Sequence, residues 1–238
     1  VQDGDETAVD CGGGACPPCG VGATCGAGSD CTTARCIGGV CADALVISEV
    51  QSRGSAGGND EFVELYNPTA SAVVVDATWT LLFRSIESGC STTDELLFTG
   101  AGQSIPSHGH LLVAAAGGAN PYDGAVAADA TYGPPSSSLS LRDAGSVILK
   151  HGAAVADALC YYLPSQMPSV FAGCGGYTCE GTPVQNDHDA SPGTNADLGL
   201  ERAPGGASGS TQDTDDNATD FAATAASDPE DLASTPVP

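Results

Sequence analysis

The residues with the clearest potential for chemistry form an acidic loop near the end of the chain. Asp213, Asp215 and Asn217 stand at alternate positions, and Asp220 follows three residues later. Carboxylate and amide oxygens at this spacing are typical of loops that bind Ca²⁺. The loop differs from an EF-hand because Ala218 stands where the sharp turn needs glycine, and a threonine replaces the bidentate glutamate. These four residues are a possible calcium site, a merely acidic loop is the alternative, and no cofactor is required.

Two histidine groups are weaker metal candidates. His108 and His110 are two residues apart and would share one face of a strand, although they could equally flank a turn and face solvent. The segment 187–189 reads Asp-His-Asp, which could bind a cation or could be only a polar loop. A catalytic zinc ion usually needs three protein ligands, and neither group has a matching partner motif.

Three glutamates on the first two expected strands could supply acid–base chemistry. A pair of carboxylates is what glycosidases use, and Glu49, Glu61 and Glu64 lie close together if those strands pair. Glu61 and Glu64 differ in parity, however, so they point to opposite faces of a strand. We expect these acids to face solvent or to pair across strands, for instance with Arg53 or Arg84. No nucleophile motif of GxSxG type occurs either, so the sequence predicts no catalytic residues and a protein that is not an enzyme.

The cysteines fall into two groups, an odd group of seven at the start and an even group of four later. The first group comprises Cys11, Cys16, Cys19, Cys25, Cys31, Cys36 and Cys41, and the second comprises Cys90, Cys160, Cys174 and Cys179. The first 41 residues contain almost no large apolar side chains, so we expect a disulfide framework to hold them. Zinc is the rival reading for the CPPC segment at 16–19, but it lacks a second CxxC and nearby histidines.

The four later cysteines allow three pairings. Cys174 and Cys179 close a tight glycine-containing loop, so they could pair with each other. Cys90 and Cys160 would then tie two strand ends together. Sequence spacing alone leaves this pairing open.

Composition excludes several classes of protein. The chain of 238 residues carries 6 Lys+Arg against 30 Asp+Glu, a formal net charge of −24. Because six cations cannot neutralise a run of phosphates, we expect no binding to nucleic acid or anionic lipid. No apolar run approaches the ~20 residues that span a bilayer, and residues 1–4 contain no signal region. Eleven cysteines indicate an oxidising compartment, so we expect a secreted or cell-surface protein whose Val1 is not the encoded start.

Short alternating apolar runs from residue 44 onward predict strands bounded by Gly, Pro, Asn and Ser. The expected strands are 45–51, 61–67, 72–75, 78–84, 95–99, 110–115, 138–141, 146–151 and 154–161. No segment of twelve residues has clear helical periodicity. The pattern favours an all-β fold, a two-sheet antiparallel sandwich over 43–238 preceded by a disulfide-rich module over 1–42.

The first 42 residues resemble a small cysteine-rich module of bacterial secreted and surface proteins. The matching segments are DGDETAVDCGG at 3–13, CPPC at 16–19, SDC at 29–31 and GGVC at 38–41. That module usually has a further cysteine before the acidic segment, and this chain lacks it. The resemblance therefore implies either a chain that starts inside a module or a seventh cysteine that forms an intermolecular disulfide.

The expected strands and the end of the chain contain a further series of motifs. They are LVISEV at 45–50, DEFVELYNP at 60–68, ATWTL at 77–81, IPSHGHLLV at 105–113, LERAP at 200–204, DTDDNATDF at 213–221 and STP at 234–236. With these motifs, residues 44–236 resemble a bacterial lamin-tail domain. The resemblance implies an immunoglobulin-like sandwich and a non-catalytic interaction module. The chain departs from the family in an insertion at about 163–197, which holds two cysteines.

These observations favour a non-catalytic extracellular structural protein that assembles with copies of itself, as a filament or a surface layer. A partner, plausibly another copy, is expected to hold the cysteine-rich head and the acidic final segment. The alternative is an accessory adhesion or glycan-binding module of a larger secreted enzyme. Its ligand would be sought at the aromatic residues Tyr161, Tyr162, Phe171 and Tyr177, in or beside the insertion.

Overall fold

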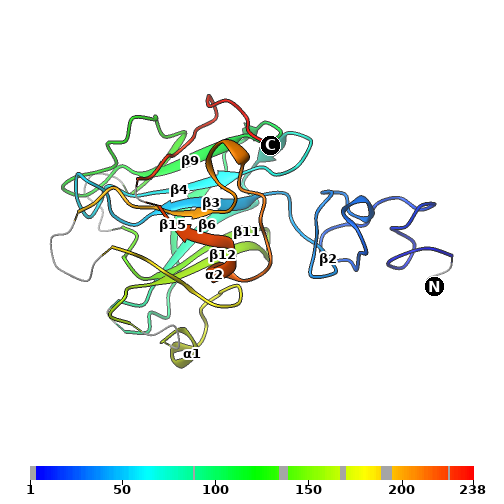
Figure 1. Cartoon of the computed structure of the whole chain (residues 1–238), viewed down its shortest axis with the longest axis horizontal. Helices are drawn as coiled ribbons and strands as arrows, with labels where there is room; N and C mark the ends of the chain where they lie inside the picture. The colour runs from blue at the N-terminus through cyan, green and yellow to red at the C-terminus, as the bar shows by residue number, and fades with distance from the viewer. Residues whose placement is uncertain (1–3, 88, 134–138, 167–169, 189–194, 225) are drawn as a thin grey trace.

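The computed structural model describes residues 4–87, 89–133, 139–166, 170–188, 195–224 and 226–238. A small head made of the first residues projects from one side of a larger β-sandwich, as Figure 1 shows. The last residues return to the sandwich, where the C-terminus lies near the end of the sheet that faces the head. No helix in the described segments is long and apolar enough to span a membrane.

Two main sheets build the sandwich within the described residues. The six-stranded sheet has the order β10-β9-β4-β3-β14-β15, and the five-stranded sheet has the order β13-β12-β11-β6-β7. The strands of the first sheet are β3 (Val46–Gln51), β4 (Phe62–Tyr66), β9 (His110–Ala115), β10 (Ala130–Tyr132), β14 (Leu200–Arg202) and β15 (Phe221–Ala223). Those of the second are β6 (Trp79–Ser85), β7 (Glu95–Thr99), β11 (Gly145–His151), β12 (Ala154–Tyr162) and β13 (Val184–Gln185). A separate ribbon pairs β5 (Val73–Val75) with β8 (Gln103–Ile105).

The predicted all-β, disulfide-rich fold is confirmed. The expected strands recur within one or two residues at their ends, except that residues 139–141 form no strand and residue 138 lies outside the described part. The strand pairs β9/β10 and β12/β13 are parallel, so the prediction that every strand pair of the sandwich is antiparallel is wrong for these two. β8, β10, β13 and β15 were not among the strands expected from alternation, because two or three residues are too few to show a period of two.

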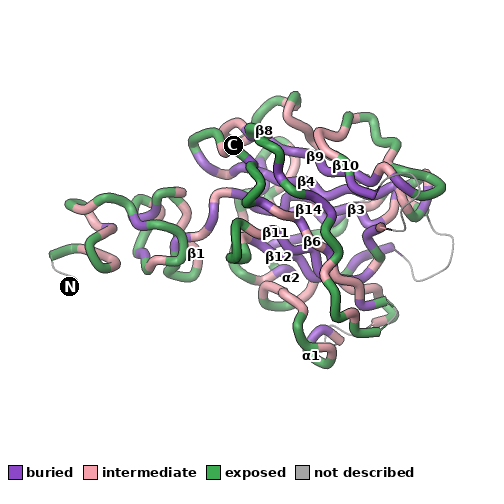
Figure 2. The backbone as a smooth tube through the Cα atoms, turned by 180° about the vertical axis from the view of Figure 1, so that it is seen from behind, coloured by how far each residue is buried: buried purple, intermediate pink, exposed green. Residues whose placement is uncertain are grey.

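The core lies between the two sheets and follows the alternation of the strands. Val63 and Leu65 of β4 face Leu81 and Phe83 of β6 across this layer, and the single tryptophan, Trp79, closes it near the head. Figure 2 shows the resulting purple band of buried backbone through the middle of the sandwich, with exposed loops around it. The inner faces thus supply the apolar burial that stabilises the fold.

The head has a core made of cysteines rather than of large apolar side chains. It contains the 3-10 turn η1 (Gly28–Asp30) and the hairpin of β1 (Cys36–Ile37) and β2 (Val40–Cys41). Gly38 and Gly39 form the two-residue turn, and both have positive φ angles that favour glycine. The buried apolar side chains here are Cys19, Cys25, Cys31 and Cys41, and Asp30 is buried beside them. Covalent links therefore replace the apolar core that this segment lacks.

Both outer faces of the sandwich are covered by segments of the same chain. The insertion, with its short helix α1 (Val170–Cys174), packs Phe171 and Tyr177 on the five-stranded sheet around Cys160. Residues 226–238, which we call the C-terminal strap, run along the six-stranded sheet and are seen in red beside β9 in Figure 1. Hydrogen bonds to Glu64, Asp129 and the His108 carbonyl hold the strap. The contacts described for the strap are therefore intramolecular, and a partner that holds the final segment stays a prediction.

Candidate functional site

The predicted calcium loop holds its oxygens against protein groups. Asp213 pairs with Arg35 of the head, and Asp220 accepts hydrogen bonds from the Thr214 amide and hydroxyl, each at 2.8 Å. The Asn217 side-chain oxygen accepts from the Cys160 amide, and its nitrogen donates to the Ala158 carbonyl, both in β12. Asp215 adopts a positive φ in the turn. Asp213, Asp215 and Asp220 are not among the described groups whose ligand atoms lie within 4.8 Å of one another. Calcium binding at this loop stays a prediction without geometric support.

The loop instead surrounds a fully buried arginine. Arg202 of β14 is 0% exposed. Its guanidinium donates to Asp157 at 2.6 Å and to the carbonyl oxygens of Ile47 and Gln212 at 2.7 Å and 2.9 Å. It also lies 3.9 Å from both Asp213 and Asp220. This one cation compensates Asp157 of β12 and two acids of the loop at 213–220, and no pattern in the sequence singles it out.

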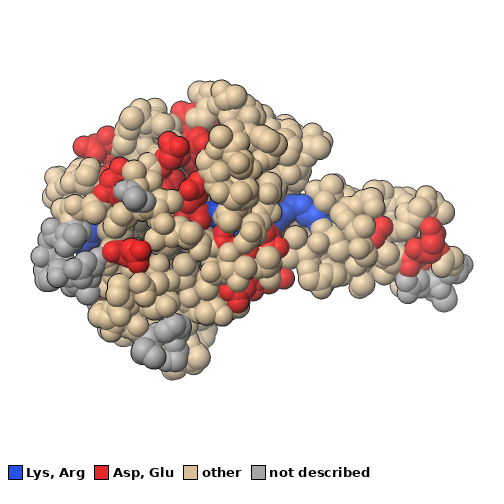
Figure 3. Space-filling view, in the orientation of Figure 1, with Lys and Arg blue, Asp and Glu red and all other residues tan. Residues whose placement is uncertain are grey.

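The Arg202 cluster also joins the head to the sandwich. Arg35 of the head reaches Asp213 and the Asp43 carbonyl, and Asp213 stands beside Arg202. On the face shown in Figure 3, the largest basic area lies where head and sandwich meet. Burial, followed by the charge of Asp157, raises the pKa of nearby Glu180 to about 10, so this carboxyl is neutral at pH 7. The cluster is a structural ion-pair network, and its chemistry is to hold two parts of the chain together.

A β-bulge creates a second cluster of ionisable groups on the outer face of the six-stranded sheet. Ile47 pairs with Leu65, but the next pair is Glu49 with Glu64, so Ser48 is an extra residue. A bulge changes which face the following residues occupy. Ile47 and Val50 both reach the core, whereas Ser48 donates to Glu64 at 2.5 Å on the outer face. Glu49 and Glu64 are therefore neighbours, and both are 2% exposed.

The C-terminal strap closes this outer cluster. The Glu230 amide donates to Glu64, and the Glu230 carboxylate lies 3.9 Å from His110 Nε2. The same ring nitrogen is 3.8 Å from Glu64 Oε1. His110 begins β9 opposite Tyr66, and the two rings pack with centroids 4.8 Å apart. Within the described residues, Glu64, His110 and Glu230 are one of two groups whose ligand atoms could surround a metal ion.

Among the described groups that shift the pKa values of Glu49 and Glu64, none is a cation. Burial raises the pKa of Glu49 to about 9, and the neighbouring charges that add to this shift are Glu201, Glu230 and Asp228. Burial likewise raises the pKa of Glu64, and the charge of Glu230 raises it further. Burial lowers the pKa of His110 to about 4, so the ring is neutral at pH 7. A neutral imidazole can bind a metal ion directly, whereas the ion competes with the proton that the raised pKa favours on each glutamate.

The expectation that Glu49, Glu61 and Glu64 face solvent is wrong, since all three are buried. Arg53 pairs with Asp143 and Arg84 pairs with Asp94, so the predicted ion pairs of these arginines with the three glutamates are not formed. Strand alternation could not reveal this arrangement. The C-terminal strap covers the outer face of β4, so both faces of this strand are buried. The bulge at Ser48 changes which face of the sheet the following residues of β3 occupy.

Glu61 belongs to a separate, fully hydrogen-bonded site. The Tyr132 hydroxyl and the Leu141 amide each donate to its Oε2 at 2.8 Å, and the Ser140 hydroxyl donates to its Oε1. Burial nevertheless raises the pKa of Glu61 to about 8. The folded chain therefore holds a proton here that an unfolded glutamate, with a pKa of about 4.3, would release at neutral pH.

This shift predicts a pH dependence of stability. A pKa that is higher in the folded chain makes a contribution that is complete below about pH 4 and is lost as the pH rises through about 8. Between about pH 6.5 and 8.5, we expect wild type to lose about 2 kcal/mol more free energy of unfolding than Glu61→Gln. Urea unfolding at several pH values measures this. Equal losses in both chains would show that Glu61 does not carry the proton.

The remaining histidine candidates serve the fold. His108 lies in the turn before β9 and has a positive φ angle, as the alternative of a turn position predicted. His110 is instead buried in the strand. His188 is buried as well, with Nδ1 at 2.9 Å from the Asn186 side chain. Asp187 accepts from Gln185, and the third residue of that acidic segment, at 189, lies outside the described residues.

Ten of the cysteines form five disulfides. The pairs are Cys11–Cys19, Cys25–Cys36, Cys31–Cys41, Cys90–Cys174 and Cys160–Cys179. Pairing of Cys174 with Cys179 is therefore wrong, because each of these residues is joined to a distant part of the sandwich instead. The Cys16 thiol donates to Glu6 at 3.2 Å. Five disulfides indicate an oxidising environment.

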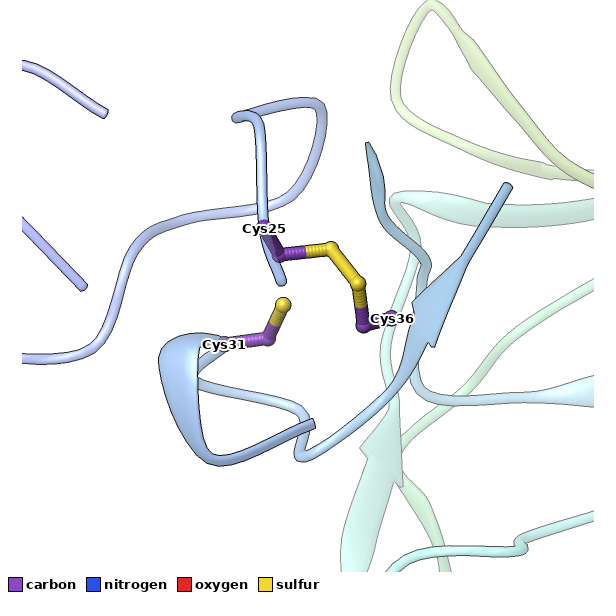
Figure 4. Close-up of side chains that lie close together, drawn as sticks. All are labelled: Cys25, Cys31 and Cys36. Atoms are coloured by element: carbon purple, nitrogen blue, oxygen red, sulfur yellow. A yellow bond between two sulfur atoms is a disulfide. The ribbon is translucent and has the colours of Figure 1, made fainter. Parts of the chain in front are cut away.

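The second group of potential metal ligands consists of Cys25, Cys31 and Cys36. Figure 4 shows the disulfide between Cys25 and Cys36 with the Cys31 sulfur beside it. Cys31 is itself bonded to Cys41. Since only thiolates bind zinc in such sites, this group is part of the covalent framework.

The aromatic residues of the insertion pack largely on protein. Tyr161 is buried in the core. Phe171 and Tyr177 meet edge to face at 5.4 Å, and the Arg84 guanidinium lies 5.5 Å from the Tyr177 ring centre. Beside Phe171 and Tyr177 a hollow of about 270 Å³ remains, which Pro183 also lines.

A comparison with models of known protein families finds no match to this chain, and a comparison with curated proteins finds no relative.

Proposed function

We propose that this chain is a non-catalytic structural part of an extracellular or cell-surface protein and that it assembles with copies of itself. The observation that carries the proposal is the way the chain is closed and cross-linked. Five disulfides bind the head and the insertion, and segments of the same chain cover both outer faces. Such construction favours durability outside the cell. The resemblance of residues 44–236 to lamin-tail domains, which are non-catalytic interaction modules, supports the same role.

An apolar groove where the head meets β12 is the proposed contact surface. Val21, Val40 and Val155 line it and are 47%, 45% and 45% exposed. The groove has a volume of about 320 Å³. Apolar side chains gathered at one hollow are more typical of a contact surface than scattered ones are. The net charge of −24 opposes association of copies, so we expect assembly to strengthen as salt screens this repulsion.

Sedimentation and electron microscopy test this proposal. We expect wild type to form larger species at high salt, with and without a calcium chelator, and Val40→Glu combined with Val155→Glu to remain monomeric. Val9→Glu is the matched control, because Val9 is 61% exposed and does not line the groove. Monomers under all conditions would contradict self-assembly. Loss of assembly with the chelator alone would implicate a bridging cation.

The hollow beside Phe171 and Tyr177 favours a second candidate function, an accessory adhesion or glycan-binding module. Aromatic rings at a hollow can stack on sugars, and this hollow lies in the insertion that departs from the resembling family. Such a module would be monomeric. Glycan binding that is lost in Tyr177→Ala, in a chain that sediments as a monomer, would favour this role over the structural one.

A further inference from the structure

We propose that Glu64, His110 and Glu230 bind one divalent transition-metal ion of the Zn²⁺ type, and that this ion fastens the C-terminal strap to the six-stranded sheet. Glu64 and His110 come from neighbouring strands, whereas Glu230 comes from the strap. An ion bound by all three would therefore link the end of the chain to its core.

The His110 ring nitrogen that faces the two glutamates forms no hydrogen bond with them. His110 Nε2 is 3.8 Å from Glu64 and 3.9 Å from Glu230, and both distances are too long for hydrogen bonds. The Glu64 carboxyl accepts hydrogen bonds from the Ser48 hydroxyl and the Glu230 amide. Ligand atoms around a tetrahedral zinc ion lie about 3.4 Å apart, given metal–ligand bonds of about 2.0–2.1 Å. The three ligand atoms here lie within 4.8 Å of one another, so side-chain movements of up to about 1.4 Å would bring them to this spacing. The imidazole favours a transition metal over Ca²⁺, which prefers oxygen ligands alone.

Two buried polar atoms beside this site, Glu49 Oε1 and His110 Nδ1, have no hydrogen-bond partner among the described residues. Neither is a ligand atom of the site, since His110 faces the two glutamates through Nε2 and Glu49 is not in the ligand group. Glu49 lies directly across from Glu64 on the covered face, with its Oε1 against Gly199. A cation at the site would offset part of the cost of burying this acid next to Glu64.

A cavity lined by acidic residues lies beside the strap. Its volume is about 260 Å³, and Gln51, Asp60, Asp123, Asp228 and Pro229 line it. Gln51 lies two residues beyond Glu49 in β3, and Asp228 and Pro229 immediately precede Glu230. Aspartates around a hollow raise the local concentration of cations, so this cavity would gather metal ions near the strap.

Metal analysis of the full chain tests the proposal. Protein stripped with a chelator and desalted is equilibrated with ZnCl₂, passed through a sizing column and analysed for bound zinc. We expect one Zn²⁺ per wild-type chain and an affinity lowered at least about tenfold in Glu230→Gln and in Glu64→Gln. Glu201→Gln is the matched control, because this neighbouring acid binds the Gly206 amide and is not in the ligand group. Cys16→Ser excludes binding by that thiol, and both controls should retain one ion.

Hydrogen exchange gives a second measurement that does not depend on affinity. Zinc should slow exchange of the Leu232 and Val237 amides, which bond to Asp129 and to the His108 carbonyl, and this protection should be absent in Glu230→Gln. Glu230 is 25% exposed in its side chain, so this variant should fold. No bound zinc, or equal zinc binding by wild type and Glu230→Gln, would overturn the proposal. Zinc bound without protection of the strap would overturn it too.

Discussion

Replacing Arg202 by methionine should lower the free energy of unfolding by roughly 3–5 kcal/mol, the typical cost of removing one partner of a buried ion pair. The guanidinium is 0% exposed, pairs with Asp157 and lies 3.9 Å from Asp213 and Asp220. Methionine keeps much of the apolar volume but leaves Asp157 without its ion-pair partner, whereas Asp213 keeps its pair with Arg35. Urea unfolding at neutral pH, with the midpoint and slope fitted together, measures the difference.

Two further variants separate the loss of charge compensation from other causes. Arg53→Met removes the cation from a pair with Asp143 in which Arg53 is 27% exposed, so a cost of about 0–1 kcal/mol is expected. Adding Asp157→Asn to Arg202→Met should recover part of the stability, because a neutral amide replaces an unpaired charge. Equal costs for Arg202→Met and Arg53→Met would show that the buried network is not what stabilises the fold.

Loss of a disulfide in the head should unfold the head while the sandwich stays folded. The Cys31–Cys41 bond closes a loop with a sequence separation of 10, which corresponds to about 3 kcal/mol in the chain-entropy model. The head buries few side chains other than its cysteines, so little remains to oppose unfolding. We therefore expect Cys31→Ala with Cys41→Ala to abolish slow hydrogen exchange throughout residues 4–41.

The sandwich supplies the matched control for the head. Cys90→Ala with Cys174→Ala removes a bond with a sequence separation of 84, yet the large apolar core between the sheets remains. This variant should unfold at lower urea concentration than wild type and still protect both the strands and the head. If the head variant kept its protected amides, the disulfides would not be the main source of head stability.

The covalent and local features were accessible from the sequence. Alternating apolar residues identified β3, β4, β6, β9, β11 and β12 because one face of each strand packs on the shared core. The concentration of cysteines in a segment without large apolar residues identified the disulfide framework of the head. The pairing of Cys90 with Cys174 was not accessible, since it depends on where the insertion folds back on the sheet.

The candidate metal site was missed because two tertiary features create it. The sequence placed Glu49 and Glu64 on paired strands, but only the extra residue Ser48 makes them neighbours on one face. The strap then buries them and adds Glu230, a residue 166 positions away from Glu64. His110 was considered only together with His108, because spacing along the chain cannot show which distant segment covers a strand.

The sequence by itself determined the all-β class, the disulfide-rich head and the acidic character of the chain, because alternation, composition and charge are local properties of the residues. The tertiary structure alone decided which acids are buried, which cation each of them meets and how the last residues are held. Arg202 illustrates the reason, since its partners come from β12 and from the loop before α2 (Asn217–Asp220). Burial and electrostatic pairing depend on distances in space, and these follow from long-range packing that no local pattern specifies.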